Sequence, residues 1–187
     1  MIETNMKRAI FCLLLLTACT RKVELPVMST VPDFTLIERS SREVKNQELA
    51  GQIWIADFVY TSCGGICPIM TGKMRKLQDM LPAEIRLVSF SVDPDVDTPA
   101  VLSEYARKFG ADRDRWLFLT GSKESLFKLS KDGFKLAIDD SNGTVLEPIT
   151  HSSRFALIDR QGRIRGYYSM DDPSELTHIV SDAKSLL

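Results

Sequence analysis

The chain has 187 residues, and its 24 Lys and Arg nearly balance its 25 Asp and Glu, which gives a formal net charge of −1. The length corresponds to about one domain, and a hydrophobic fraction of 44% is ample for a single core. No block of basic residues alternates with aromatic residues, so we expect no nucleic-acid partner.

The start of the chain has the pattern of an export signal. Two basic residues, Lys7 and Arg8, precede the apolar run from Ala9 to Leu16. That run is too short to cross a bilayer as a helix, which takes about 20 apolar residues. The next residues complete the sequence Leu16-Thr17-Ala18-Cys19, which resembles a bacterial lipobox, in which cleavage before the cysteine leaves Cys19 to carry lipid. Ordinary secretion and an uncleaved anchor are the alternatives.

These features divide the chain into three predicted parts: a lipoprotein signal peptide over residues 1–18, a lipidated tether over residues 19–30 and a folded domain over residues 31–187. The tether prediction rests on Pro26 and on the absence of clear periodicity around it. We therefore expect a protein of the bacterial cell envelope that is lipid-anchored to a membrane and faces the periplasm or extracytoplasmic side.

Apolar periodicity predicts strands that alternate with helices. A β-branched and aromatic run from Ile53 to Val59 predicts a buried strand, and apolar residues at helical spacing from Ile69 to Leu81 predict a helix. The later predicted elements are a strand at 85–92, a helix from Thr98 to about Phe109, a strand at 116–119, a helix from Ser122 to near Gly133, a strand at 134–138 that leads through Ser141-Asn142-Gly143 into another short one, a hairpin of 155–159 and 163–168, and a helix from Pro173 to about Leu187. This order favours an α/β domain of thioredoxin type, a mixed β-sheet flanked by helices, with a C-terminal β-hairpin and helix.

Once the signal peptide has been removed together with Cys12 and Cys19 carries lipid, Cys63 and Cys67 are the only thiols left for chemistry. They lie where a predicted strand gives way to a helix, and Pro68 suits the first helical position. Cys67 is therefore expected at or just before the helix N-terminus, where free N–H groups and the macrodipole favour a thiolate. The spacing allows both sulfurs to bind one ion or to close a disulfide. A purely structural disulfide explains little, because so short a loop removes little entropy from the unfolded chain.

His151 is the candidate imidazole partner of this pair. It directly precedes the strand predicted near Phe155, and in a thioredoxin-like sheet that loop comes beside the redox-active corner. We therefore expect His151 to face Cys63 and Cys67, whereas His178 is expected on the surface of the last helix. Two thiolates and one imidazole form a soft donor set that suits Cu(I) and accommodates Cu(II) with a weak added ligand, while zinc normally takes a fourth ligand.

Residues 58–68 (Phe-Val-Tyr-Thr-Ser-Cys-Gly-Gly-Ile-Cys-Pro), residues 91–99 and the distant His151 resemble the Sco/SenC family of copper proteins. The spacing C-x-x-x-C-P with a distant histidine is far more specific than a bare cysteine pair. The resemblance implies that Cys63, Cys67 and His151 are the ligands of one copper ion per domain, as Cu(I) or Cu(II).

The resemblance also implies a membrane-tethered metallochaperone. Such a protein delivers copper to, or maintains the thiols of, the binuclear copper site in subunit II of cytochrome c oxidase. A periplasmic thiol reductant would have to act first, because a disulfide cannot bind copper as two thiolates. Family members often carry an acidic residue just before the histidine, where this chain has Thr150.

The competing class is a periplasmic thiol–disulfide oxidoreductase that uses the same cysteine pair, one thiolate attacking a substrate disulfide and the other resolving the mixed disulfide. Against it, three residues rather than two separate Cys63 from Cys67, and no proline stands just before the strand at Phe155. A peroxidase is less favoured, because Tyr60 occupies the position three residues before Cys63 where threonine or serine is expected. The same sulfurs serve both a chaperone and a reductase, so enzymatic activity stays open.

Overall fold

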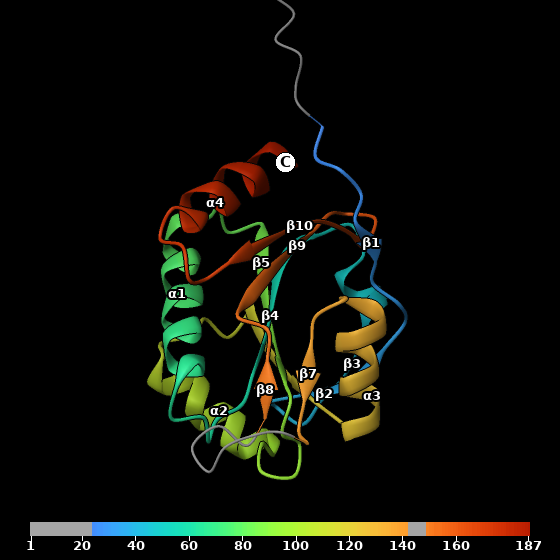
Figure 1. Cartoon of the computed structure of the whole chain (residues 1–187), viewed down its shortest axis with the longest axis vertical. Coiled ribbons are helices and arrows are strands. Elements are labelled where there is room, and N and C mark those ends of the chain that lie inside the picture. Colours follow the sequence, from blue (N-terminus) through green and yellow to red (C-terminus); the bar gives the residue numbers. More distant parts are fainter. Residues whose placement is uncertain (1–23, 142–148) are drawn as a thin grey trace, which may run out of the picture.

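The structure is a computed structural model, and it describes residues 24–141 and 149–187 (Figure 1). The predicted signal peptide, the lipidated Cys19 and residues 142 and 143 of the predicted turn lie outside these ranges. Every helix within the two ranges is too short or too polar to cross a bilayer.

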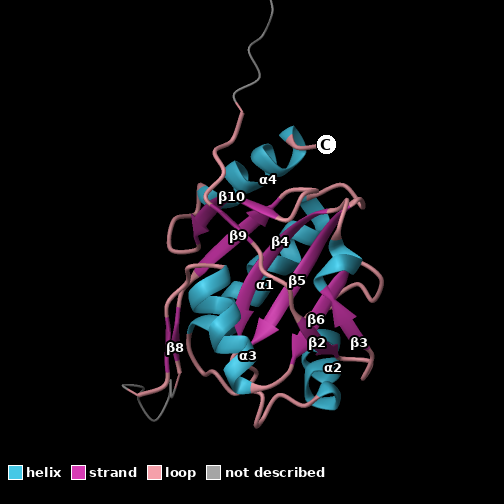
Figure 2. Cartoon of the chain, turned by 90° about the vertical axis from the view of Figure 1, so that its right-hand side faces the viewer, coloured by secondary structure: helices cyan, strands magenta, loops and turns pink. Residues whose placement is uncertain are grey.

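A mixed sheet of eight strands runs through the centre of the described chain, in the order β1-β10-β9-β4-β5-β6-β2-β3 (Figures 1 and 2). Its middle strands, which are parallel to one another, are almost wholly buried because both faces of the sheet are covered. The other strands pair antiparallel at the two sides. The strands are β1 (Ser29–Thr30), β2 (Thr35–Glu38), β3 (Glu43–Lys45), β4 (Ile53–Val59), β5 (Ile85–Ser91), β6 (Trp116–Thr120), β9 (Arg154–Ile158) and β10 (Arg163–Ser169).

Helices cover both faces of this sheet. Helices α1 (Ile66–Met80) and α2 (Pro99–Lys108) lie on one face, α3 (Lys123–Lys128) lies on the other, and α4 (Glu175–Ser185) packs beside α1 and β10 (Figure 1). The first two helices connect neighbouring parallel strands in the same direction across the sheet, and the right-handedness of such crossovers puts them on the same face. The thioredoxin-type α/β architecture predicted from the sequence is confirmed.

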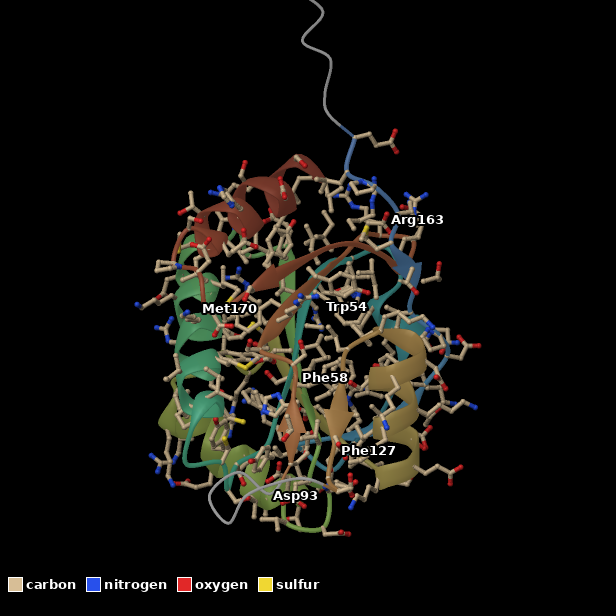
Figure 3. The ribbon with its side chains drawn as sticks, in the orientation of Figure 1. Trp54, Phe58, Asp93, Phe127, Arg163 and Met170 are labelled. Carbon is tan, nitrogen blue, oxygen red and sulfur yellow. The ribbon has the colours of Figure 1, made fainter. Side chains whose placement is uncertain are left out.

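Aromatic rings fill the space between the sheet and α3. Trp54 and Phe58, which follow one another along the same face of β4 (Figure 3), both meet the ring of Phe134, with centroids 6.0 and 5.2 Å away. Phe58 also stacks on Phe90 of β5 at 5.1 Å. These contacts fix β4, and with it the position from which the cysteine loop departs.

The predicted starts of two helices at Thr98 and Ser122 are confirmed, and the hydrogen bonds of their caps explain them. The Thr98 hydroxyl accepts the backbone N–H of Val101 at the start of α2, and the Ser122 hydroxyl accepts that of Ser125 at the start of α3. The predicted hairpin also forms, since β9 and β10 pair antiparallel. These features depend on neighbouring residues, which is why the sequence reveals them.

The predicted strand at 134–138 is wrong for most of its length. Only Ile138–Asp139 is extended, as β7, whereas Phe134 has helical dihedrals and Lys135 has a positive φ of 54°. The chain before them forms a π-turn over Leu129–Gly133, and the backbone N–H of Phe134 bonds to Leu129. Burial of the Phe134 ring among the aromatics therefore overrides the strand preference of this segment.

The last helix begins later than predicted. α4 starts at Glu175 rather than Pro173, and the Asp172 carboxylate accepts the backbone N–H and hydroxyl of Ser174 at 2.8 Å each. Asp172 thus forms a turn before the helix instead of capping it.

The last residues of the predicted tether are attached to the domain. Ser29–Thr30 pair with β10, and the buried Arg165 donates to the backbone carbonyls of Leu25 and Pro26. The Arg165 guanidinium also lies 2.8 Å from the buried carboxylate of Asp159. The chain enters at one end of the molecule, and α1 begins at the other (Figure 1).

Arg165→Met should destabilise the domain by about 3 kcal/mol, because it leaves the Asp159 carboxylate buried without its most enclosed partner. Chemical denaturation measures this value. Arg163→Met is the matched control, since Arg163 pairs with the same carboxylate but is partly exposed, and its loss should cost less than about 1 kcal/mol. Equal losses in the two variants would contradict the role assigned to the buried pair.

Candidate metal centre

The two cysteines lie at the junction of β4 and α1. Cys63 is in the connecting loop, and Cys67 is the second residue of α1, where its side chain is fully buried. The helix begins at Ile66, so Pro68 is its third residue and not its first as predicted. Proline is tolerated there because the N–H groups of a first turn have no helical acceptor. The earlier start turns Cys67 inward.

His151 reaches the buried cysteine from a different part of the chain. It lies in β8 (Thr150–His151), which pairs with β7 so that His151 is opposite Ile138. Its Nε2 is 3.0 Å from the Cys67 sulfur, and its Nδ1 is 3.2 Å from the carbonyl oxygen of Ser152. A carbonyl only accepts, so Nδ1 carries the proton, and the Nε2 lone pair faces the sulfur, which is the tautomer that binds a metal through Nε2.

The two thiols differ in their electrostatics. Burial opposes ionisation of Cys63, but the neighbouring backbone N–H groups of Cys67 and Gly65 and the thiol of Cys67 favour its thiolate, and the net effect lowers the pKa of Cys63. Burial raises the pKa of Cys67 well above its usual range, and the charge of the Cys63 thiolate raises it further. The sequence argument favoured a thiolate at Cys67; the structure favours one at Cys63, because Cys67 lies too deep to be solvated.

The described residues place the predicted ligands next to one another without closing a site. Cys63 and Cys67 are free thiols, and Cys67 contacts His151. Across the two described ranges, however, no three His, Cys, Asp or Glu side chains are arranged to hold an ion. A three-donor set therefore requires Cys63 to turn toward the other two. The loop is open on the side of Gly64, where a Cβ would have no neighbour within 4 Å.

Asp97 holds the cysteine loop and was not predicted as a site residue. Its fully buried carboxylate accepts the Thr61 hydroxyl at 2.5 Å, the Thr61 backbone N–H at 3.2 Å and the Ser91 hydroxyl at 2.6 Å. Thr61 is two residues before Cys63. The carboxylate therefore fixes the loop against the end of β5 through contacts that join residues 36 positions apart.

Asp57 is a second buried acid beneath the site. Its Oδ1 accepts the Ser89 hydroxyl at 2.6 Å, while its Oδ2 has no hydrogen-bond partner among the described residues. Burial raises the pKa of Asp57 to about 7, and its charge contributes to the raised pKa of Cys67. An acid inside the apolar run of β4 is the sequence signal that could have revealed it.

Two other predicted features can be placed. His178 is exposed on α4, with its Nδ1 3.1 Å from Glu175, so its predicted surface position is confirmed. Thr150, which replaces the acidic residue expected from the resemblance, is exposed and lies opposite Asp139 in the β7–β8 pair. A carboxylate is thus present across the strands instead of beside the histidine in sequence.

The fold and this corner define a thioredoxin-like protein with two thiols and an imidazole at the start of the first long helix. The family model described as SCO1/SenC matches residues 24–187. The chain therefore belongs to the SCO1/SenC family.

Known relatives cover almost the whole chain. The SCO1 protein homolog of Bacillus subtilis is 34% identical over 177 residues, 92% of this chain and 91% of the relative. A SCO1/SenC family lipoprotein of Bacillus anthracis superposes with a TM-score of 0.77 at 35% identity, over 84% of this chain and 95% of its own. BsSco, described as a Sco cytochrome c oxidase assembly protein with a disulfide switch, superposes with a TM-score of 0.75 at 33% identity, over 87% of this chain and 97% of its own. A protein of Stutzerimonas stutzeri named a putative copper-binding protein is 33% identical, over 76% of this chain and 71% of its own.

Asp97→Ala should destabilise the protein by about 2–4 kcal/mol, because two hydroxyls and one backbone N–H lose their buried acceptor. Denaturant unfolding gives the value, and hydrogen exchange should show faster opening of residues 60–64. Asp95→Ala is the control, since Asp95 is an exposed acid of the same segment, and it should change stability by less than about 0.5 kcal/mol. Similar effects of both substitutions would rule out the clamp.

The reduced protein should be alkylated first at Cys63. Its lowered pKa supplies thiolate below the ordinary midpoint of about 8.5, whereas the raised pKa of Cys67 keeps that group a thiol to higher pH. Iodoacetamide labelling from pH 5 to 10, read by peptide mass spectrometry, measures both profiles. A lower midpoint for Cys67 than for Cys63 would reverse the assignment.

Proposed function

We propose that this protein binds one copper ion through Cys63, Cys67 and His151 and delivers it to the binuclear copper site in subunit II of cytochrome c oxidase. The observation that carries the proposal is the 3.0 Å approach of His151 Nε2 to the Cys67 sulfur, beside a second free thiol, in a SCO1/SenC chain. Two sulfurs and one imidazole are a soft donor set of low coordination number, which suits Cu(I). The relatives described as copper-binding and as oxidase assembly proteins support the same role.

Copper loading requires the reduced pair. Metal binding takes both cysteines as thiolates, and the lower pKa of Cys63 makes it the first to ionise and bind. In an oxidising compartment a thiol reductant therefore acts before loading. The ion then displaces the proton of Cys67, which is released to solvent, and the positive charge of the ion compensates for the burial that keeps Cys67 neutral in the free protein.

Delivery proceeds by ligand exchange at the open side of the corner. Ser62 and Gly64 flank Cys63 and are exposed, so an acceptor thiol or imidazole can reach an ion held by that sulfur. Cys67 is fully buried and contacts His151, so these two ligands hold the ion until the exchange is complete.

The membrane attachment belongs to this proposal. Lipid on Cys19 would hold the chain at a membrane in the periplasm, and the Bacillus anthracis relative is itself described as a lipoprotein. The chain enters the domain at the end opposite the start of α1, where the cysteines lie (Figure 1). The corner would therefore point away from the lipid and toward a partner.

A second candidate function is thiol–disulfide exchange by the same pair. The asymmetry of the thiols favours it. Cys63, whose pKa is lowered, would be the attacking cysteine, and the neighbouring Cys67, whose pKa is raised, would be the resolving one. Such an activity would maintain the thiols of the copper acceptor.

Anaerobic titration of the reduced mature chain should give one copper per molecule, with sulfur and imidazole donors in X-ray absorption. Cys63→Ser and Cys67→Ser should each abolish tight binding, and His151→Ala should weaken it by at least about tenfold, a loss of about 1.4 kcal/mol. His178→Ala is the matched control and should bind as the unchanged protein does.

An unaltered copper affinity in all three ligand variants would contradict the assignment of these residues as copper ligands. A sample that holds no copper but rapidly reduces protein disulfides would establish the oxidoreductase instead.

A further inference from the structure

Tyr60 carries a buried hydroxyl whose presence the fold does not explain. The side chain is 1% exposed, and its hydroxyl makes no hydrogen bond of ordinary geometry within residues 24–141 and 149–187. A buried hydroxyl without a partner costs stability, whereas phenylalanine would fill nearly the same space without that cost. A group of this kind points to a function or to a partner that is present only in another state.

The surroundings of Tyr60 join the two halves of the candidate metal centre. Its ring meets that of His151 edge to face, with centroids 5.8 Å apart, and its backbone carbonyl accepts the N–H of Cys63 at 3.4 Å. The hydroxyl lies near enough to the Cys63 sulfur and to the backbone N–H of Ile149 for each to shift the pKa of Tyr60. One side chain therefore borders both the cysteine loop and the strand that carries His151.

The acceptor strength of sulfur changes with its charge. A thiol is a weak hydrogen-bond acceptor, whereas a thiolate is a strong one, so a sulfur that copper holds as a thiolate offers the hydroxyl an acceptor that it does not use within the described ranges. Copper binding is the event that fixes this sulfur as a thiolate. The hydroxyl is also near the backbone N–H of Ile149, so the same group can accept from that N–H and steady the segment that leads to His151.

We propose that Tyr60 is a positioning residue of the copper site: its hydroxyl donates to the copper-bound Cys63 sulfur, holds that sulfur toward Cys67 and His151, and weakens its electron donation to the ion. The inference rests on the proposed function and adds to it the group that tunes the Cys63 ligand. A hydrogen bond to a metal-bound sulfur is an established means of tuning such sites.

The test compares Tyr60→Phe with the full chain and with Tyr168→Phe. Tyr168 is a matched control, because it is also a buried tyrosine, but its hydroxyl donates to Asp182 at 2.7 Å, away from the cysteines. In the reduced, copper-free protein, Tyr60→Phe should leave the melting temperature unchanged or raise it, while Tyr168→Phe should lower it.

In the copper-loaded proteins, Tyr60→Phe should be the variant with the larger effect. Tyr60→Phe should lose Cu(I) to a chelator about tenfold faster than the unchanged protein, the expected effect of one hydrogen bond to a charged acceptor. Its sulfur-to-Cu(II) absorption band should move to longer wavelength, because a sulfur without the donor releases electrons more readily. Tyr168→Phe should change neither quantity.

Three other outcomes would contradict the role proposed for Tyr60. Unchanged copper release and absorption in Tyr60→Phe would overturn it and leave the proposed function intact. A copper-free Tyr60→Phe protein as destabilised as Tyr168→Phe would show that the hydroxyl is merely structural. An unchanged protein that holds no copper would overturn the proposed function and this inference together.

Discussion

The contact between the Cys67 sulfur and Nε2 of His151 depends on two placements in the fold. It joins residues 84 positions apart, and it forms only because α1 begins early enough to turn Cys67 inward and because β8 brings His151 across the cysteine loop. The π-turn that leads to Phe134 serves the same end, since it anchors the chain in the aromatic core just before β7, the strand on which β8 is built.

Depth gives the two cysteines different tasks. Cys67 lies in the first turn of α1 and is fully buried, and this burial outweighs the favourable field of the helix terminus. Cys63 is buried as well, but it lies between the exposed Ser62 and Gly64, and the neighbouring groups of Cys67 favour its thiolate, so ionisation begins there. Ligand exchange and disulfide exchange both start at a thiolate that a partner can approach, which explains why one corner fits both functions.

Prediction from the sequence succeeds where the cause is local and fails where the cause is distant. The bounds of β4 and the Thr98 cap follow from neighbouring residues, and the contact of His151 with Cys67 follows from the order of the strands. The contact of Asp97 with Thr61 joins two loops, so no periodicity reveals it. The sequence of segment 134–138 predicts a strand. That prediction fails because the partners of Phe134, and not the propensity of the segment, set its conformation.

The buried polar groups indicate that the reduced, metal-free state is not the one for which the corner is built. Among the described residues, the buried side-chain atoms without partners are Asp57 Oδ2, the Tyr60 hydroxyl and Thr120 Oγ1, and the first two lie close enough to the cysteines to interact with them electrostatically. Buried polar groups in native proteins are almost always satisfied. Stability is therefore given up beside the thiols, where a metal-bound sulfur would give the Tyr60 hydroxyl an acceptor.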